Sequence, residues 1–311
     1  MCCRSSWSSC SCSAPSSRGS PVPSRTRLIA DQLSSFSCRQ GESPRYDART
    51  SELVWVDTVA GRVFRGQIRA GALTDVTQYE IGARVGVAVP MAEPSAGWAL
   101  AVSDGFAHLA RDGTVTPLVT GLVTGADQMN DGVCHPDGSF WAGSQAIPRQ
   151  PRAALFRLGP DGVVTTALDG LTVSNGIDFA ADGEALYLVD TLPHRRLERI
   201  EVHGATLGDR QVVTEVSGGN PDGLVVDDDG CVWVAVWDGA EVRRYAPTGE
   251  LLAVVGLPVP RPTAVCFQGG TLIITTASIG LDEPPPGSGH LFAVDTGVTG
   301  PPSRPWAGIA R

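Results

Sequence analysis

Short apolar runs separated by Asp-Gly or Gly-Gly turns recur along most of the chain. Three segments share one order: a small polar or acidic residue beside Gly, an apolar strand, an Asp-Gly turn and a second apolar strand. They are MNDGVCHPDGSFWAGS (129 to 144), SNGIDFAADGEALYLVDT (174 to 191) and PDGLVVDDDGCVWVAVWDG (221 to 239). Asn130, Asn175 and Asp222 open them at steps of 45 and 47 residues. A repeat of about 40 to 50 residues that holds several strands is typical of a β-propeller.

From about Leu28 onward the pattern divides the chain into six units. The three repeated segments open units three to five, and the other units are 41 to 66, 98 to 119 and 262 to 297. Each unit can form a four-stranded antiparallel sheet, so we predict an all-β fold, a six-bladed β-propeller over residues 28–311. The segment RLIADQLSSFS (27 to 37) is expected to supply a strand that closes the last blade.

Composition agrees with a soluble all-β protein. The chain of 311 residues holds 37 Gly and 23 Pro, which favour turns over helices. Its net charge of −9 and the lack of a basic cluster argue against a nucleic-acid partner. No apolar stretch approaches the roughly 18 residues that span a bilayer, so we expect no membrane insertion. We expect a monomer or a small homo-oligomer.

The cysteines fall into two groups. Cys38, Cys134, Cys231 and Cys266 are scattered through strand-like sequence and match no zinc motif, so we expect small buried hydrophobes and a cytoplasmic location. The other four lie in the Ser-rich segment 1–27, which lacks the features of a secretory signal. This segment is predicted to be disordered, and a misassigned start codon would explain it equally well.

The polar residues that open the units are the candidate site. In a propeller the first strand of each blade lines the central channel, so Glu42, Asn130, Asn175 and Asp222 should meet at one mouth of it. Two carboxylates and two amide oxygens suit one divalent metal ion, with Ca²⁺ favoured and Mg²⁺, Mn²⁺ or Zn²⁺ as alternatives. Asn-Gly and Asp-Gly are also common hairpin turns. Here a second turn follows each strand, which favours the functional interpretation.

Several other residues are expected to be structural. The run DDDG (227 to 230) lacks the spaced ligands of a calcium loop and is interpreted as a turn. The same holds for the carboxylates of the second turns, Asp137, Asp182 and Asp229. The tryptophans at second-strand positions, Trp55, Trp141 and Trp233, are predicted to be blade core, whereas Trp237 could reach a ligand. The five histidines form no catalytic pattern and no G-x-S-x-G elbow is present, so a Ser-His-Asp mechanism is not supported.

The ordered segments GESPRYD, NDG, SNGIDF and PDGLVVD resemble the SMP-30/gluconolactonase family, which includes regucalcin and sugar lactonases. The resemblance runs from about Leu28 to the C-terminus and implies a six-bladed propeller with a divalent metal at the channel mouth. It implies that Glu42, Asn175 and Asp222 are metal ligands, with Asn130 at or near the metal. It also implies that Asp131 contacts substrate and that Asp222 is the general base.

One position departs from the family. Sugar-lactone members usually carry Arg two residues before the NDG asparagine, and this chain has Gln128, which brings no charge. We therefore expect a metal-dependent lactonase for a sugar-type or related small lactone, with Gln128, Asn130 and Asp131 orienting the ring. The ion would polarise the carbonyl while Asp222 or metal-bound water supplies the nucleophile. The alternatives are an ester or phosphotriester hydrolase on the same scaffold and a non-catalytic calcium-binding propeller.

Overall fold

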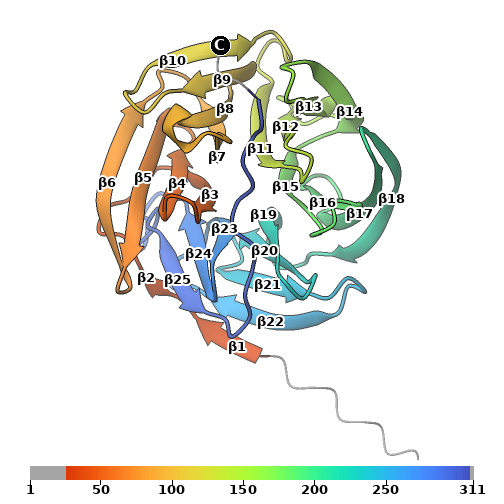
Figure 1. Cartoon of the computed structure of the whole chain (residues 1–311). Coiled ribbons are helices and arrows are strands. Elements are labelled where there is room, and N and C mark those ends of the chain that lie inside the picture. Colours follow the sequence, from red (N-terminus) through yellow and green to blue (C-terminus); the bar gives the residue numbers. More distant parts are fainter. Residues whose placement is uncertain (1–25, 309–311) are drawn as a thin grey trace, which may run out of the picture.

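The computed structural model describes residues 26–308, which form a ring of six β-sheets (Figure 1). Within this range the one helical element is a 3-10 turn, η1 (Pro94–Ala96). Each sheet is one blade, and four consecutive strands, or three in the last blade, follow one another from the centre of the ring outward before the N-terminal strands are added to the last two blades. The predicted six-bladed β-propeller is confirmed. The predicted disordered segment lies almost entirely outside the described residues.

The first three blades are built from consecutive strands. Blade 1 holds β3 (Gly41–Asp47), β4 (Glu52–Asp57), β5 (Arg62–Arg69) and β6 (Ala72–Glu80). Blade 2 holds β7 (Val85–Pro90), β8 (Trp98–Val102), β9 (Gly105–Leu109) and β10 (Val115–Val119). Blade 3 holds β11 (Gln128–Cys134), β12 (Phe140–Gln145), β13 (Ala153–Leu158) and β14 (Val164–Leu171).

The last three blades add the N-terminal strands. Blade 4 holds β15 (Ser174–Phe179), β16 (Ala185–Asp190), β17 (Arg196–His203) and β18 (Thr206–Glu215). Blade 5 holds β19 (Asn220–Val226), β20 (Val232–Trp237), β21 (Glu241–Tyr245), β22 (Leu251–Gly256) and β1 (Thr26–Ile29). Blade 6 holds β23 (Pro262–Gln268), β24 (Thr271–Thr276), β25 (Phe292–Asp295) and β2 (Asp31–Gln32).

The N-terminal segment closes the ring, as expected, but it does so across two blades. Strand β2 pairs antiparallel with β25 and becomes the outer strand of blade 6. Strand β1 pairs in parallel with β22 and adds a fifth strand to blade 5. One short segment therefore pairs with the outer strands of both blades and ties the last blade to its neighbour.

Blade 2 begins earlier than the sequence pattern suggested. The second unit was placed at residues 98 to 119, which are the three outer strands, whereas the innermost strand is β7. All six residues of β7 are buried, and it has no Asn or Asp at its start. A short apolar run without alternation or a turn signal is a weak strand signal, so this strand was missed.

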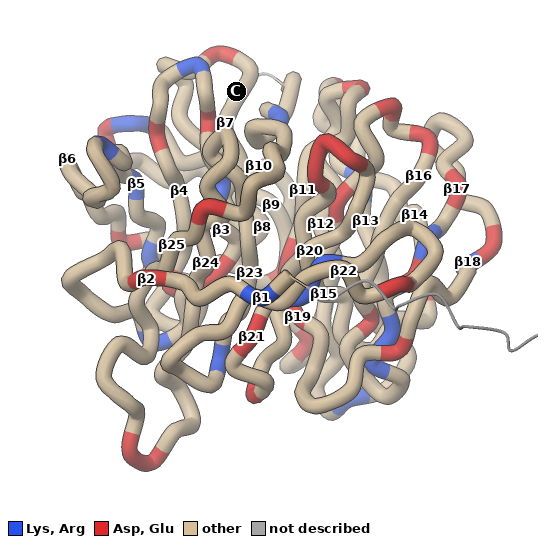
Figure 2. The backbone as a smooth tube through the Cα atoms, turned by 90° about the horizontal axis from the view of Figure 1, so that it is seen from below, with Lys and Arg blue, Asp and Glu red and all other residues tan. Residues whose placement is uncertain are grey.

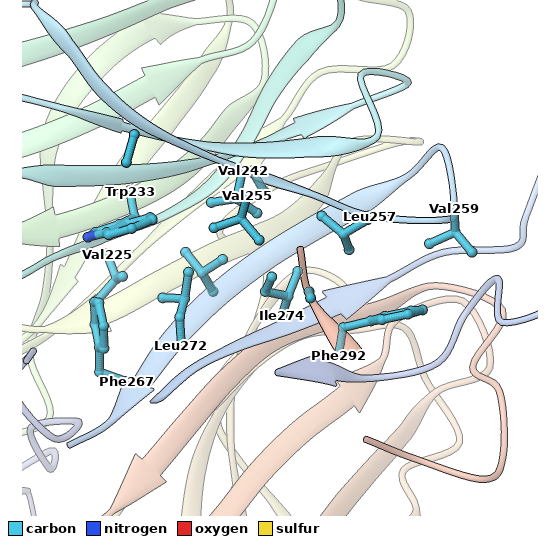
Figure 3. Packing of buried hydrophobic residues seen from close by; sticks show 14 residues of the cluster. Val225, Trp233, Val242, Val255, Leu257, Val259, Phe267, Leu272, Ile274 and Phe292 are labelled. Carbon is cyan, nitrogen blue, oxygen red and sulfur yellow. The ribbon is translucent and has the colours of Figure 1, made fainter. Parts of the chain in front are cut away.

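Six hydrophobic clusters fill the spaces between neighbouring blades. The tryptophans predicted to be core, Trp55, Trp141 and Trp233, are at most 1% exposed. Figure 3 shows the cluster between blades 5 and 6, where Trp233 meets Phe267 edge-to-face at 6.1 Å between ring centroids. The blades are therefore held together mainly by side-chain packing between sheets.

The scattered cysteines belong to these clusters or border them. Cys38, Cys134, Cys231 and Cys266 are buried free thiols, which confirms the prediction that they are small hydrophobes. Burial raises the pKa of the Cys38 and Cys266 thiols to about 12. A thiol with so high a pKa is a poor nucleophile at neutral pH.

The C-terminal segment crosses the centre of the ring, where it appears as the dark blue trace in Figure 1. The backbone amide of Ser303 donates to the Tyr46 carbonyl, and Trp306 pairs with the β7 end through the Pro90 carbonyl. Both contacts lie where inner strands end. This segment therefore covers the mouth of the channel opposite the starts of the inner strands.

Charges of both signs are interspersed over the strands and loops of the described chain (Figure 2). Many are paired, as for Arg62 with Glu80 and Arg196 with Glu215. No helix among the described residues is long and apolar enough to cross a membrane.

Candidate metal and substrate site

The residues that open the inner strands sit in irregular stretches of the ladder. The pairing register shifts between Glu42 and Arg45 in β3, and between Met129 and Gly132 in β11. Strands β15 and β19 have the same shift at Asn175 and Asp222. Such β-bulges bend a strand and re-aim side chains, and they are common beside active sites. Here they occur where the polar side chains reach the channel.

Two glycines of the inner strands, one beside Asn175 and one in β7, allow neighbouring strands to approach closely. A β-carbon at Gly176 would collide with the Asp222 carbonyl oxygen, and one at Gly86 would collide with the Asn130 carbonyl oxygen. Neither glycine has the positive φ of a turn residue. Their role is to bring the openings of successive blades together, which supports the functional interpretation over the turn interpretation.

A cavity of about 270 Å³ lies at this mouth of the channel. All four residues predicted as metal ligands line it: Glu42, Asn130, Asn175 and Asp222. Their side chains come from blades 1, 3, 4 and 5, so residues up to 180 positions apart in sequence share one site. Trp237, which is the last residue of β20 and not a residue beyond the strand, lines the same cavity.

Two carboxylates of the site are buried without a salt bridge among the described residues. Glu42 and Asp222 are 7% and 5% exposed, and neither has a salt-bridge partner within 4.0 Å in the described part of the chain. Burial, and then repulsion from Asp131, raises the pKa of Glu42 to about 8. Burial, and then repulsion from Glu42, raises the pKa of Asp222 well above its ordinary value. This part of the cavity therefore favours a positive charge.

A chain of hydrogen bonds orients the two amides. Asn130 Nδ2 donates to the Ser174 carbonyl at 2.9 Å and to Asn175 Oδ1 at 3.1 Å. Asn175 Nδ2 donates to Thr191 Oγ1 at 3.0 Å, and this hydroxyl donates to the Pro221 carbonyl. Both amide nitrogens are engaged by the protein, whereas Asn130 Oδ1 accepts no hydrogen bond from the described residues and Asn175 Oδ1 accepts one, which leaves it a second lone pair for a ligand.

Asp131 is turned away from the cavity. Its Oδ1 accepts hydrogen bonds from Ser43 Oγ at 2.8 Å and from the Gly132 amide at 2.8 Å. It also forms a buried salt bridge with Arg45 at 3.2 Å. Ser43 has a positive φ of 46°, a strained conformation for this residue, and its amide donates to Glu42. Asp131 thus supports the backbone that carries Glu42, and its expected contact with substrate remains a prediction.

Gln128 lies one side chain behind the cavity wall. It pairs across the ladder with Gln145, whose Nε2 lies 3.5 Å from Gln128 Oε1. Gln145 lines the cavity, and its Oε1 accepts a hydrogen bond from Arg149 Nη1 at 2.7 Å. Gln128 itself is not among the residues that line the cavity, and its expected contact with the lactone ring remains a prediction.

Sequence reasoning missed several cavity residues: Gln40, Arg84, Gln145, Arg149, Thr191 and Asn220. The signal for Arg84 was present, because it directly precedes the apolar run of β7 and so occupies the opening of blade 2. Arg149 lies in the loop between β12 and β13, and no repeat pattern marks it.

The donor set fits a divalent cation. Among residues 26–308 no group of three or more His, Cys, Asp and Glu side chains could hold a metal ion. The candidate set instead joins two carboxylates, Glu42 and Asp222, with the amide oxygens of Asn130 and Asn175. Oxygen ligands of this kind suit hard divalent ions, and a cation would offset the burial and the repulsion that raise the pKa of both carboxyl groups.

Comparison with known proteins matches the whole propeller. Regucalcin of Danio rerio is 31% identical over 284 residues, which cover 86% of this chain and 95% of that protein. The 6-deoxy-6-sulfogluconolactonase of Pseudomonas putida is 32% identical over 274 residues, covering 84% and 92%. The crystal structure of regucalcin from Agrobacterium tumefaciens, a calcium-binding protein, superposes with a TM-score of 0.83 at 22% identity, covering 90% and 98%. The last similarity supports the fold.

A family-level match covers all four ordered motifs. The family model "SMP-30/Gluconolactonase/LRE-like region" matches residues 40–278, from the residue before β3 to just beyond β24. The matched range contains Glu42, Asn130, Asn175 and Asp222. Together with two full-length relatives above 30% identity, this match shows that the chain belongs to the SMP-30/gluconolactonase/LRE-like family.

Proposed function

We propose that the protein is a divalent-metal-dependent lactonase that hydrolyses a sugar-type or related small lactone. The observation that carries the proposal is the convergence of Glu42, Asn130, Asn175 and Asp222 in one cavity. The name of the Pseudomonas putida relative, a sulfogluconolactonase, supports this substrate class. The calcium-binding relative supports a divalent ion, with Ca²⁺ favoured.

The four predicted ligands would hold the ion through their oxygens. When bound, a divalent ion supplies Lewis-acid polarisation of a carbonyl and stabilises the negative charge that develops on its oxygen. The hydrogen bonds that the two amide nitrogens donate to Ser174 and Thr191 support this role, because they would leave amide oxygen lone pairs for the ion. The site is thus preorganised, and little reorganisation is needed when the reaction begins.

Asp222 is the proposed general base. It would accept a proton from water while the water oxygen bonds to the lactone carbonyl carbon. The ring C–O bond then breaks, and the leaving oxygen takes a proton, so one water is consumed and one hydroxy acid is formed. Asp222 must be ionised to act, and a neighbouring cation would lower the pKa that burial and Glu42 raise.

The experiment is a panel of γ- and δ-lactones with protein stripped by EDTA and then resupplied with Ca²⁺, Zn²⁺, Mn²⁺ or Mg²⁺. Lactone opening releases a proton at neutral pH, so the reaction is followed with a pH indicator against a protein-free blank. We expect hydrolysis that EDTA abolishes and one or more ions restore. Metal-dependent turnover of phosphotriesters alone would favour the phosphotriesterase alternative. Melting that depends on metal, without turnover of any substrate, would favour a calcium-binding propeller.

A further inference from the structure

Two arginines line the cavity, and neither forms a salt bridge with a carboxylate of the described residues, although Glu42 attracts Arg84 from a longer distance. Within residues 26–308, neither Arg84 nor Arg149 has a salt-bridge partner within 4.0 Å. Arg261, which stacks on the cavity residue Trp237, differs because it is paired with Asp238 at 2.7 Å. The charges of Arg84 and Arg149 are therefore available to a ligand.

Arg84 is held at the start of β7 with an incomplete set of hydrogen bonds. Its Nε is buried, and it has no hydrogen-bond partner among the described residues. Burial lowers the pKa of Arg84; attraction by Glu42 partly opposes this shift, and repulsion from Arg149 adds to it. A buried donor without a partner costs free energy, so this arrangement is expected where a ligand supplies the missing acceptor.

Arg149 approaches the same side of the cavity from blade 3. Its Nη1 donates to Gln145 Oε1 at 2.7 Å and contacts the Ala146 carbonyl at 3.4 Å. These acceptors are neutral, so they fix the position of the guanidinium and leave its charge uncompensated. Arg149 and Arg84 come from neighbouring blades and act on one another as like charges.

The charge balance of the cavity favours an anionic ligand. Its charged lining residues are Glu42, Asp222, Arg84 and Arg149. With both carboxyl groups ionised, their two negative charges balance the two positive charges of the guanidinium groups. A divalent ion at the carboxylates would leave an excess of two positive charges. A neutral sugar lactone would not compensate this excess, whereas a lactone with an acidic substituent would.

We propose that Arg84 and Arg149 bind an anionic substituent, a carboxylate or sulfonate, of the lactone whose carbonyl is placed beside Glu42 and Asp222. This inference rests on the proposed lactonase function and specifies its substrate class. Arginine presents a planar pair of donors that matches such oxyanions, and charge-assisted bonds of this type are stronger than neutral ones. The two arginines would then decide specificity without taking part in the hydrolytic step.

The test compares glucono-γ-lactone with glucaro-γ-lactone, which differ only in a CH₂OH or a carboxylate at C6. We expect the metal-loaded protein to prefer the anionic lactone in kcat/KM. Arg149→Gln should lower kcat/KM for that lactone about 10- to 100-fold, the loss expected for charged hydrogen bonds, and change the neutral one less than about threefold. The matched control is Arg196→Gln, because Arg196 is paired with Glu215 outside the cavity. It should change neither value.

A second readout does not depend on turnover. Calorimetric titration of the metal-loaded protein with glucarate and gluconate should show tighter binding of glucarate, and Arg149→Gln should remove this preference. Equal losses for both lactones would place Arg149 at the reacting carbonyl and overturn the proposal. Lactone hydrolysis without any preference for the anionic substrate would also overturn it while leaving the lactonase function intact. Selective glucarate binding without hydrolysis of any lactone would uphold the anion site and contradict the lactonase function.

Discussion

Asn-Gly and Asp-Gly pairs have two different roles in this chain. At Asp137-Gly138 and Asp182-Gly183 the glycine has a positive φ, of 83° and 79°, and the pair forms a hairpin turn. At Asn175-Gly176 the glycine lacks a positive φ, and it allows two inner strands to touch. The position of the pair relative to the strand separates the two roles. Asp137 and Asp182 also accept backbone hydrogen bonds within their turns, as structural residues do.

Asp222→Ala should abolish lactone hydrolysis, with kcat/KM lowered by about 1,000-fold or more. The substitution removes both a ligand of the proposed ion and the proposed base. Removing one member of a set of residues that work together in catalysis lowers the rate by a large factor. The matched control is Asp182→Ala, which removes a carboxylate from an exposed Asp-Gly turn of blade 4. Its activity should stay within about twofold. Activity of Asp222→Ala within tenfold of the wild type would contradict the assigned role.

Strand β7 and the C-terminal segment show how elements without a polar motif shape the site. Strand β7 carries Arg84 into the cavity at one end, and its other end receives the C-terminal segment. Trp306 is 1% exposed, and its backbone pairs with Pro90 and Ala92. Its indole nitrogen donates to the Gly159 carbonyl at 3.3 Å. The segment thus joins blades 2 and 3 at the mouth opposite the cavity.

Trp306→Ala should lower the free energy of unfolding by about 3 to 5 kcal/mol, the usual cost of truncating a buried tryptophan. The measurement is denaturant unfolding. Val163→Ala serves as the control because Val163 is 56% exposed, and a surface change of this kind costs about 0.5 kcal/mol or less. A loss below 1 kcal/mol for Trp306→Ala would mean that the segment does not hold the blades together. Below its melting temperature the variant should keep its KM, since the cavity lies at the other mouth.

The closed ring forces charges from distant parts of the chain into one channel. Glu42 and Asp222 belong to blades 1 and 5, and packing of the blades brings them together against their mutual repulsion. The free energy of folding therefore depends on pH and on the ion. This dependence belongs to the whole molecule, since unfolding separates the two carboxylates.

Without metal, the free energy of unfolding should fall as the pH rises from about 4.5 to about 8. The pKa of Glu42 is raised from 4.5 to about 8 in the folded state, so its contribution is fully present below the lower value and is lost above the higher one. Saturating Ca²⁺ should stabilise the protein most at the upper end of this range, where protons compete least. Denaturant midpoints with EDTA or Ca²⁺ measure both effects.

The control for this pH dependence is Glu42→Gln, which should flatten the difference between low and high pH in the metal-free protein. If the metal-free wild type instead becomes more stable than Glu42→Gln as the pH rises, the two carboxylates are not destabilised by burial and repulsion.

The sequence alone determined the architecture and much of the candidate site. The period of 45 to 47 residues, the paired turns and the apolar strands predicted six blades and the buried tryptophans, because each repeat carries its own strand and turn signals. The same period placed Glu42, Asn130, Asn175 and Asp222 in phase, and all four line one cavity. Their roles as ligands remain proposals that the metal and variant experiments test.

Only the tertiary structure decided those features of the site that leave no pattern in the local sequence. Contacts between blades determine three features: the inner position of β7, the presence of Arg84 and Arg149 in the cavity, and the orientation of the Asp131 side chain toward Ser43. A repeat pattern marks where a strand begins. It does not show in which direction a carboxylate side chain points at a β-bulge, or which arginine forms no salt bridge. Those outcomes arise from packing and charge balance around the closed ring, which no single repeat contains.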